Sequence, residues 1–283
     1  MRYFKHRDHD FPVLGIGTYR VGGVPSLQAE EIEILQRARS DYHFSLIDTA
    51  EMYGAGNSEL LVGKYLKEQQ RDDWFVVDKI MPSHAVPGRF EQHCRESLER
   101  LDVDYLDLYL LHWRDRVRLQ TMVDEMENLV AKGLIRHWGV SNFDVSDMED
   151  LFQCEGGSNC FANQFLYNLS SRGVEYDLIP WCKAHDVLIM TYSPLGNEIL
   201  KREAMTKDAN VRAIAERHHV PAVAVVLAFV VRNNDLITVF KTSSHQHLVE
   251  NMQVLDFQLD DEDMQLLEQS FPAPKKKESL KKI

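Results

Sequence analysis

The sequence predicts an α/β fold of the (β/α)8 type, in which eight parallel strands close into a barrel and helices surround it. Short β-branched or aromatic runs alternate with helical patterns along the chain. Most successive runs lie about 30 residues apart, the length of one strand–helix unit in a parallel sheet. No linker or change in composition divides the 283 residues. We therefore expect one domain over residues 1–283.

The expected strands are short apolar runs that end at polar or titratable residues. A hairpin over residues 1–11 is expected ahead of them, closing the bottom of the barrel. Pro272-Ala273-Pro274 should stop the last helix, which makes residues 272–283 a polar, mobile tail. In chain order the expected strands are Val13–Gly17, Ser45–Asp48, Trp74–Lys79, Asp107–Leu111, Arg136–Ser141, Phe161–Gln164, Leu188–Tyr192 and Thr238–Phe240.

Helical periodicity is clearest after the fourth strand, where apolar residues recur three or four apart and Gly133 marks the helix end. Asp144 is placed to cap the next helix. Two helical patterns, Val211–His218 and Ala222–Arg232, precede the eighth strand and are separated by Pro221. This arrangement predicts one extra helix before strand eight, and we expect another after it.

Charge and hydropathy limit the classes of function. With 44 acidic and 32 basic residues, the net charge of −12 argues against nucleic acid or an anionic membrane as the main partner. The longest apolar run, Val220 to Val231, contains a proline and is too short to span a bilayer, so we expect a buried helix. The N-terminal residues lack the apolar stretch of a signal peptide. We expect a soluble, cytoplasmic protein.

The cysteines and paired histidines give no metal signature. Cys94, Cys154, Cys160 and Cys182 form no CxxC pair, so neither a zinc site nor a redox dithiol is predicted. They are interpreted as free cytosolic thiols. The pairs at positions 245 and 247 and at 218 and 219 lack a third ligand and are interpreted as surface helix residues. We expect no metal.

Four titratable residues are expected to meet at the carboxyl ends of three neighbouring strands, where barrel active sites form. Asp48, Lys79 and His112 end or follow strands two, three and four, and Tyr53 lies in the loop after strand two. Taken singly, each has an ordinary structural role as a helix cap, a packed ring, a surface charge or a core histidine. Together they favour a site, because a lysine after three apolar residues is partly buried and needs a counter-charge.

This set of side chains suits carbonyl reduction. A hydride donor attacks the carbonyl carbon while the oxygen gains a proton, for which Tyr53 is the candidate donor. Tyrosine has a pKa of about 10, and we expect the Lys79 cation to lower it while Asp48 holds the lysine. His112, if neutral, would donate a hydrogen bond to the substrate oxygen.

The sequence resembles the aldo-keto reductase superfamily from about Leu14 to Asn251, and several motifs carry the resemblance. They are Asp48-Thr49-Ala50-Glu51-Met52-Tyr53-Gly54, the Lys79 strand end, Leu110-Leu111-His112-Trp113, Gly139-Val140-Ser141-Asn142-Phe143 and Tyr192-Ser193-Pro194-Leu195-Gly196. The family's catalytic tetrad maps onto Asp48, Tyr53, Lys79 and His112. Tyr19 and Trp113 join Tyr53 and His112 as expected substrate-pocket residues.

The resemblance implies a nicotinamide cofactor held without a Rossmann domain, and Arg20 indeed replaces the third glycine of the usual fingerprint. His247 stands where the better-known branch carries an arginine for the 2′-phosphate. NADP(H) is therefore expected, with NAD(H) as the other candidate. The cofactor-binding residues implied by family position are Gly17, Thr18, Tyr19, Asp48, Ser141, Asn142, Gln164, Tyr192, Ser193, Leu195, Gly196, Lys241, Thr242, Ser243, His247, Glu250 and Asn251.

Three functions are compared. The first is an NADP-dependent reductase of aldehydes and some ketones, with a small carbonyl compound as partner and a monomeric state. Short loops after strands four and seven predict an open site for it. A metal- or phosphate-dependent isomerase or lyase would need several carboxylates at strand ends, which strands five to eight lack. The third is a cofactor-binding regulatory subunit with little turnover, as in potassium-channel β-subunits of the same family. The reductase is favoured.

Overall fold

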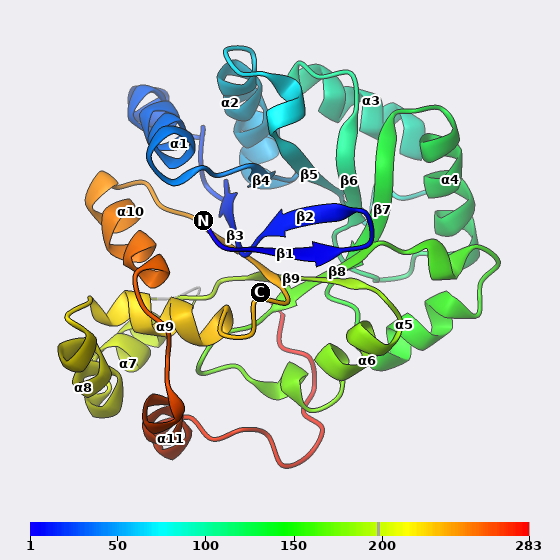
Figure 1. The fold of residues 1–283 in the computed structure, drawn as a ribbon. Helices are drawn as coiled ribbons and strands as arrows, with labels where there is room; N and C mark the ends of the chain where they lie inside the picture. Colours follow the sequence, from blue (N-terminus) through cyan, green and yellow to red (C-terminus); the bar gives the residue numbers. More distant parts are fainter. Residues whose placement is uncertain (197–198, 283) are drawn as a thin grey trace.

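Eight parallel strands form a closed barrel in the order β10-β3-β4-β5-β6-β7-β8-β9, with helices around it (Figure 1). The structure is a computed structural model that describes residues 1–196 and 199–282. It confirms the predicted fold, and strand ends lie within two residues of the predicted ones. The barrel strands are β3 (Leu14–Gly17), β4 (Leu46–Asp48), β5 (Phe75–Ile80), β6 (Leu106–Leu111), β7 (Ile135–Ser141), β8 (Ala162–Leu166), β9 (Leu188–Tyr192) and β10 (Ile237–Phe240).

The predicted N-terminal hairpin is also confirmed. Strands β1 (Tyr3–His6) and β2 (His9–Pro12) pair antiparallel and lie across the barrel opening in Figure 1. Phe11 is 2% exposed, and its ring centroid lies 5.0 Å from that of Phe75 and 6.1 Å from that of Phe161. Both partners stand where a barrel strand begins, so the hairpin seals the end of the barrel opposite the site.

The helices follow the predicted alternation, with one addition. Asp144 caps α5 with a capping box, and Gly133, with a φ of 70°, follows α4. Three helices rather than two lie between β9 and β10 in the described chain, since α7 was not predicted. Its sequence, ILKREAMT, buries only Met205 and so shows little apolar periodicity. The helices are α1 (Gln28–Tyr42), α2 (Asn57–Leu66), α3 (Phe90–Leu101), α4 (Leu119–Ala131), α5 (Val145–Phe152), α6 (Leu178–Ala184), α7 (Ile199–Thr206), α8 (Ala209–His218), α9 (Ala222–Val230), α10 (His245–Met252) and α11 (Asp261–Ser270).

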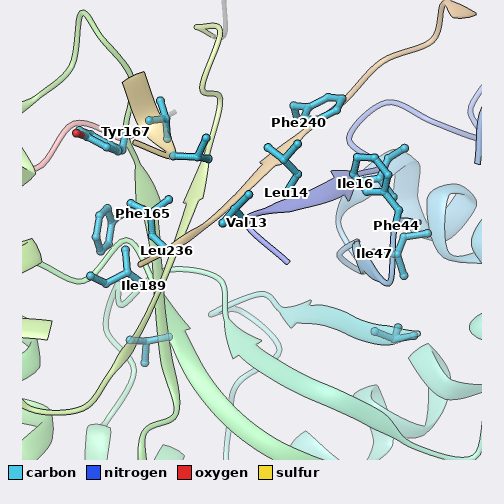
Figure 2. Close-up of a cluster of buried hydrophobic side chains, with 14 of the residues drawn as sticks. Val13, Leu14, Ile16, Phe44, Ile47, Phe165, Tyr167, Ile189, Leu236 and Phe240 are labelled. Carbon is cyan, nitrogen blue, oxygen red and sulfur yellow. The ribbon is translucent and has the colours of Figure 1, made fainter. Parts of the chain in front are cut away.

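Two apolar layers hold the barrel. One fills its interior, and the other lies between the strands and the helices. Figure 2 shows part of the outer layer, where Leu14, Ile16 and Phe240 from β3 and β10 lie beside Phe44 and Ile47. The side chains of each strand contribute alternately to the two layers because successive side chains point to opposite faces of the sheet.

The apolar helix α9 belongs to the outer layer, with eight of its residues buried. Across the described ranges, no single helix is long and apolar enough to cross a membrane. Helices α8 and α9 reach that threshold only as a pair and are bent by 98° between them.

Part of the C-terminal tail, which the sequence predicted to be mobile, packs on the protein. Lys277 forms ion pairs with Asp144 at 3.4 Å and Asp177 at 3.0 Å, and Leu280 packs against the outer core layer. Figure 1 shows the red tail turning back from α11 toward the barrel. The sequence contains these residues, but it does not show that the starts of α5 and α6 bring two carboxylates to Lys277.

Candidate active site

Adjacent strands bring three of the predicted catalytic residues together. Asp48 is the last residue of β4, Lys79 lies near the end of β5, and His112 directly follows β6. These strands are consecutive neighbours in the barrel. Tyr53 begins the short 3-10 helix η2 (Tyr53–Gly56), which follows β4. The convergence predicted from the strand ends is therefore present.

Lys79 is the centre of this group. Its side chain is fully buried, and Nζ donates to Asp48 Oδ1 at 2.6 Å and to the Thr49 carbonyl at 2.7 Å. Burial alone would lower the pKa of Lys79, but Asp48 and Tyr53 outweigh that effect and raise it. Gln164 Nε2 donates to the other Asp48 oxygen at 2.7 Å. The ammonium therefore stays charged and fixed in one position.

Tyr53 is the third partner of this ammonium. Lys79 Nζ lies 3.4 Å from the Tyr53 hydroxyl and 5.0 Å from the ring centroid. The expectation of a lowered pKa was wrong. Burial raises the pKa of Tyr53, and the Lys79 charge opposes this without overcoming it. The tyrosine is accordingly protonated at neutral pH, as a proton donor must be.

His112 completes the group. Its ring centroid lies 5.8 Å from that of Tyr53, and only 8% of the residue is exposed. Burial, aided by the Lys79 charge, lowers the pKa of His112 to about 3. The imidazole is thus neutral and can donate one hydrogen bond, the condition set by the sequence argument.

Aromatic rings border this group at the positions predicted for the substrate pocket. The Trp113 ring lies 5.1 Å from that of His112, and the Tyr19 ring lies 5.2 Å from that of Tyr53. Tyr19 is 47% exposed and stands at the rim. The four residues predicted for the pocket are therefore contiguous.

The residues predicted to hold the nicotinamide carboxamide lie beside the tetrad. Asn142 Nδ2 donates to the His112 carbonyl and to Ser141 Oγ, each at 3.1 Å, and its Oδ1 accepts from the Tyr192 hydroxyl at 2.6 Å. Asn142 adopts a φ of 62°, which asparagine tolerates better than most residues. Gln164 joins this network through Asp48. These amides are thus placed on two sides of the catalytic group.

The predicted adenosine end follows β10, and its polar groups fit an anionic nucleotide. Lys241 forms no ion pair among the described residues, and burial lowers its pKa while nearby Arg20 lowers it further and Glu31 opposes both. Asn251 is buried, and its Oδ1 lacks a hydrogen-bond partner in the described ranges. A cation without an ion pair among the described residues and an unsatisfied acceptor suit a phosphate and an adenine amine, respectively.

The other predicted cofactor residues are of three kinds. Some are accessible to solvent, some already use their hydroxyl groups in hydrogen bonds within the protein, and some are strand-end or turn residues. Ser243 and His247 are exposed, and Glu250 is half-buried. Thr18 and Thr242 already use their hydroxyls on the Asp48 and Ser244 carbonyls. The other positions are strand-end or turn residues: Gly17 on β3, and Ser193, Leu195 and Gly196 after β9.

Two relevant residues were missed in the sequence. Arg20 was noted only as a departure from a glycine motif, yet its charge is close enough to Lys241 to lower the pKa of that lysine. Asn168 is buried and donates to the Ser193 carbonyl at 3.0 Å, which positions the loop after β9. Its only signal is an asparagine shortly after a strand end.

The fold and the site together define the class: a barrel oxidoreductase in which a tyrosine, a lysine, an aspartate and a neutral histidine surround one reaction centre. The chain matches the Aldo/keto reductase family over residues 13–271, and it belongs to that family.

Individual relatives agree with this assignment. Methylglyoxal reductase YeaE of Escherichia coli is 41% identical over 273 residues, covering 96% of this chain and 95% of that protein. Glyoxal reductase of Bacillus subtilis is 29% identical over 263 residues, covering 92% and 88%. A crystal structure of an aldo/keto reductase from Klebsiella pneumoniae, in complex with NADP and acetate, is 38% identical with a TM-score of 0.93, covering 97% and 96%.

Proposed function

We propose that this chain reduces aldehydes and some ketones to alcohols with NADPH, and that Tyr53 supplies the proton. The observation that carries the proposal is the buried Lys79 ammonium, which contacts both Asp48 and the Tyr53 hydroxyl beside a neutral His112. Family membership and the NADP bound to a relative of the same fold support the cofactor.

The reduced nicotinamide supplies, when bound, a hydride to the carbonyl carbon. His112 donates a hydrogen bond to the carbonyl oxygen and orients it. Tyr53 Oη transfers its proton to that oxygen as negative charge develops there. Lys79 stabilises the phenolate that remains, because its charge lies 3.4 Å away, and Asp48 keeps the lysine in place. The residues of the protein thus carry out the proton transfer, and the fixed Lys79 cation lies at the centre of the site.

Different residues of the site would hold different parts of the cofactor. Ser141, Asn142 and Gln164 would hold the carboxamide, and Tyr192 would stack on the ring. Lys241 and Arg20 would face the adenosine phosphate, with His247 close to it in sequence. NADPH should be favoured over NADH because Lys241 and Arg20, which interact electrostatically, would together attract the 2′-phosphate.

The preferred substrates are proposed to be small 2-oxoaldehydes. Two relatives are named for reducing methylglyoxal and glyoxal. The rim formed by Tyr19, Trp113 and Tyr53 would cover the short apolar part of such a compound, while His112 and Tyr53 hold the reacting oxygen.

We also infer that the enzyme works in the cytoplasm as a monomer and single domain. All four cysteines are free thiols, three of them buried, as is usual in a reducing compartment.

The decisive experiment mixes purified protein with NADPH or NADH and a panel of aldehydes, and follows loss of reduced-cofactor absorbance. Turnover of methylglyoxal with NADPH, lost in Tyr53→Phe, supports the proposal. Tight NADPH binding without turnover on any carbonyl would instead favour the regulatory-subunit alternative.

A further inference from the structure

A cluster of two histidines and two glutamates lies beside the active site but takes no part in the chemistry described above. Glu51 comes from the loop after β4, His84 from the loop after β5, and His93 and Glu96 from α3. Glu51 Oε1 lies 3.1 Å from His84 Nδ1, and Glu51 Oε2 lies 3.6 Å from His93 Nδ1. His93 Nδ1 also lies 3.3 Å from Glu96 Oε2. Three separate segments thus direct ligand-type atoms at one point.

The centre of this cluster is a buried carboxylate. The Glu51 side chain is 4% exposed, and its ion-pair partners within the described residues are both histidines. Its Oε1 additionally accepts a hydrogen bond from the Met81 amide at 2.6 Å. A buried carboxylate needs a compensating charge, and a histidine provides one only when protonated. A bound divalent cation would provide it at any neutral pH.

We propose that Glu51, His84 and His93, whose ligand atoms lie within 4.8 Å of one another, form a divalent transition-metal site best suited to Zn²⁺, with a water molecule as the fourth ligand. Zinc takes imidazole nitrogens and carboxylate oxygens at about 2.0–2.2 Å, which places neighbouring ligands of a tetrahedron roughly 3.3 Å apart. The two histidine nitrogens lie 3.1 and 3.6 Å from the Glu51 carboxylate, each nearest a different oxygen of it. Two imidazole nitrogens and one carboxylate oxygen match zinc better than calcium or magnesium, which prefer oxygen ligands alone.

One local movement is required. The His84 and His93 rings stack in parallel, with centroids 4.0 Å apart and planes 5° apart, so a single ion cannot lie in both ring planes as they stand. The His84 side chain is 35% exposed and that of His93 is 11% exposed. Turning the more exposed His84 ring therefore closes the site without moving the core.

Metal binding would stiffen the link between two catalytic residues. The Glu51 amide donates to the Lys79 carbonyl at 3.3 Å, and Glu51 lies two residues before Tyr53. A cation at this cluster would fix the loop that carries Tyr53 against the strand that carries Lys79. The binding proposal itself does not depend on the reductase assignment.

A second cluster offers an internal control. His218, Asp260 and Asp263 also group their ligand atoms. There, however, Arg217 already pairs with Asp260 at 2.7 Å and also with Asp263. Because Arg217 already supplies the positive charge that these carboxylates need, we expect no metal at this second cluster.

The test uses the full chain treated with a chelator and then titrated with ZnCl2 by calorimetry, and with CoCl2 by visible absorption. We expect about one ion per chain, a Co²⁺ spectrum with the strong bands of four-coordinate geometry, and a Tm raised by roughly 4 °C at a hundredfold excess over Kd. Glu51→Gln and His84→Asn should each weaken binding roughly tenfold or more, whereas His218→Asn should leave it unchanged.

Equal Zn²⁺ affinity in wild type, Glu51→Gln and His84→Asn would overturn the proposal. So would loss of the ion in His218→Asn alone, or no binding by the wild-type chain. His84 is half-exposed, so His84→Asn decides the matter even where the buried Glu51 variant fails to fold.

Discussion

Lys79→Met tests the central claim about the site, because it removes the only cation that contacts the Tyr53 hydroxyl among the described residues. The lost interaction can be sized from the structure. At 3.4 Å and an effective dielectric constant of about 20, a unit charge stabilises the phenolate by about 5 kcal/mol as an upper figure. Allowing for solvent at the rim, we expect kcat with methylglyoxal to fall by roughly 10²–10⁴-fold.

The same variant should lose stability. Asp48 is 2% exposed and would keep its charge without the partner now 2.6 Å away. Removing one member of a buried pair costs about 3–5 kcal/mol, or roughly 5–8 °C in Tm for a chain of this size. The double variant Asp48→Asn/Lys79→Met leaves no unpaired charge, and it should recover about 2 kcal/mol or more of that loss.

Two measurements check this reasoning: initial rates of cofactor oxidation, and thermal or denaturant unfolding of both variants beside the wild type. A Lys79→Met protein that keeps kcat within about threefold and melts within about 1 °C of wild type would refute it. A double variant no more stable than the single one would show that Asp48 is not left as an uncompensated charge.

Three further predictions concern single residues. Tyr53→Phe should lower kcat by ~10²–10⁴-fold while the Kd for NADPH, measured by fluorescence titration, changes little; near-normal turnover would remove Tyr53 as the proton donor. Because the pKa of His112 is lowered to about 3, the unfolded chain binds a proton below about pH 6.5 that the folded protein does not, so stability falls as pH drops toward 3. His112→Asn should therefore reduce the loss of unfolding free energy between pH 7 and pH 5 by about 2 kcal/mol. If urea unfolding at the two pH values gives the same loss for wild type and His112→Asn, the lowered pKa is contradicted. Lys241→Ala should weaken NADPH binding roughly tenfold or more with little effect on NADH, and His247→Arg should sharpen the NADPH preference; tighter NADH binding by the wild type would reverse the cofactor assignment.

The sequence alone was sufficient to predict the barrel and the meeting of Asp48, Lys79 and His112 at the ends of neighbouring strands. The roughly 30-residue repeat requires parallel strands, and parallel strands place their carboxyl ends on one face. Asp48, Lys79 and His112 each stand at such an end, so their meeting follows from position along the chain. Helix limits with local signals, such as the Asp144 cap and the Gly133 stop, were predictable for the same reason.

Only the tertiary structure decided the features that depend on burial and on contacts between distant segments. The direction of the Tyr53 pKa results from competition between desolvation and the Lys79 charge, and a sequence names the charge without giving the depth of burial. The tail that ion-pairs through Lys277 depends on carboxylates more than 90 residues earlier in the chain. His84 and His93 have no metal-type spacing on their own, because their common partner Glu51 comes from the preceding strand–helix unit. Local sequence patterns specify helices and strands. The pairing of charges and the grouping of possible metal ligands depend on distances between residues that only folding fixes.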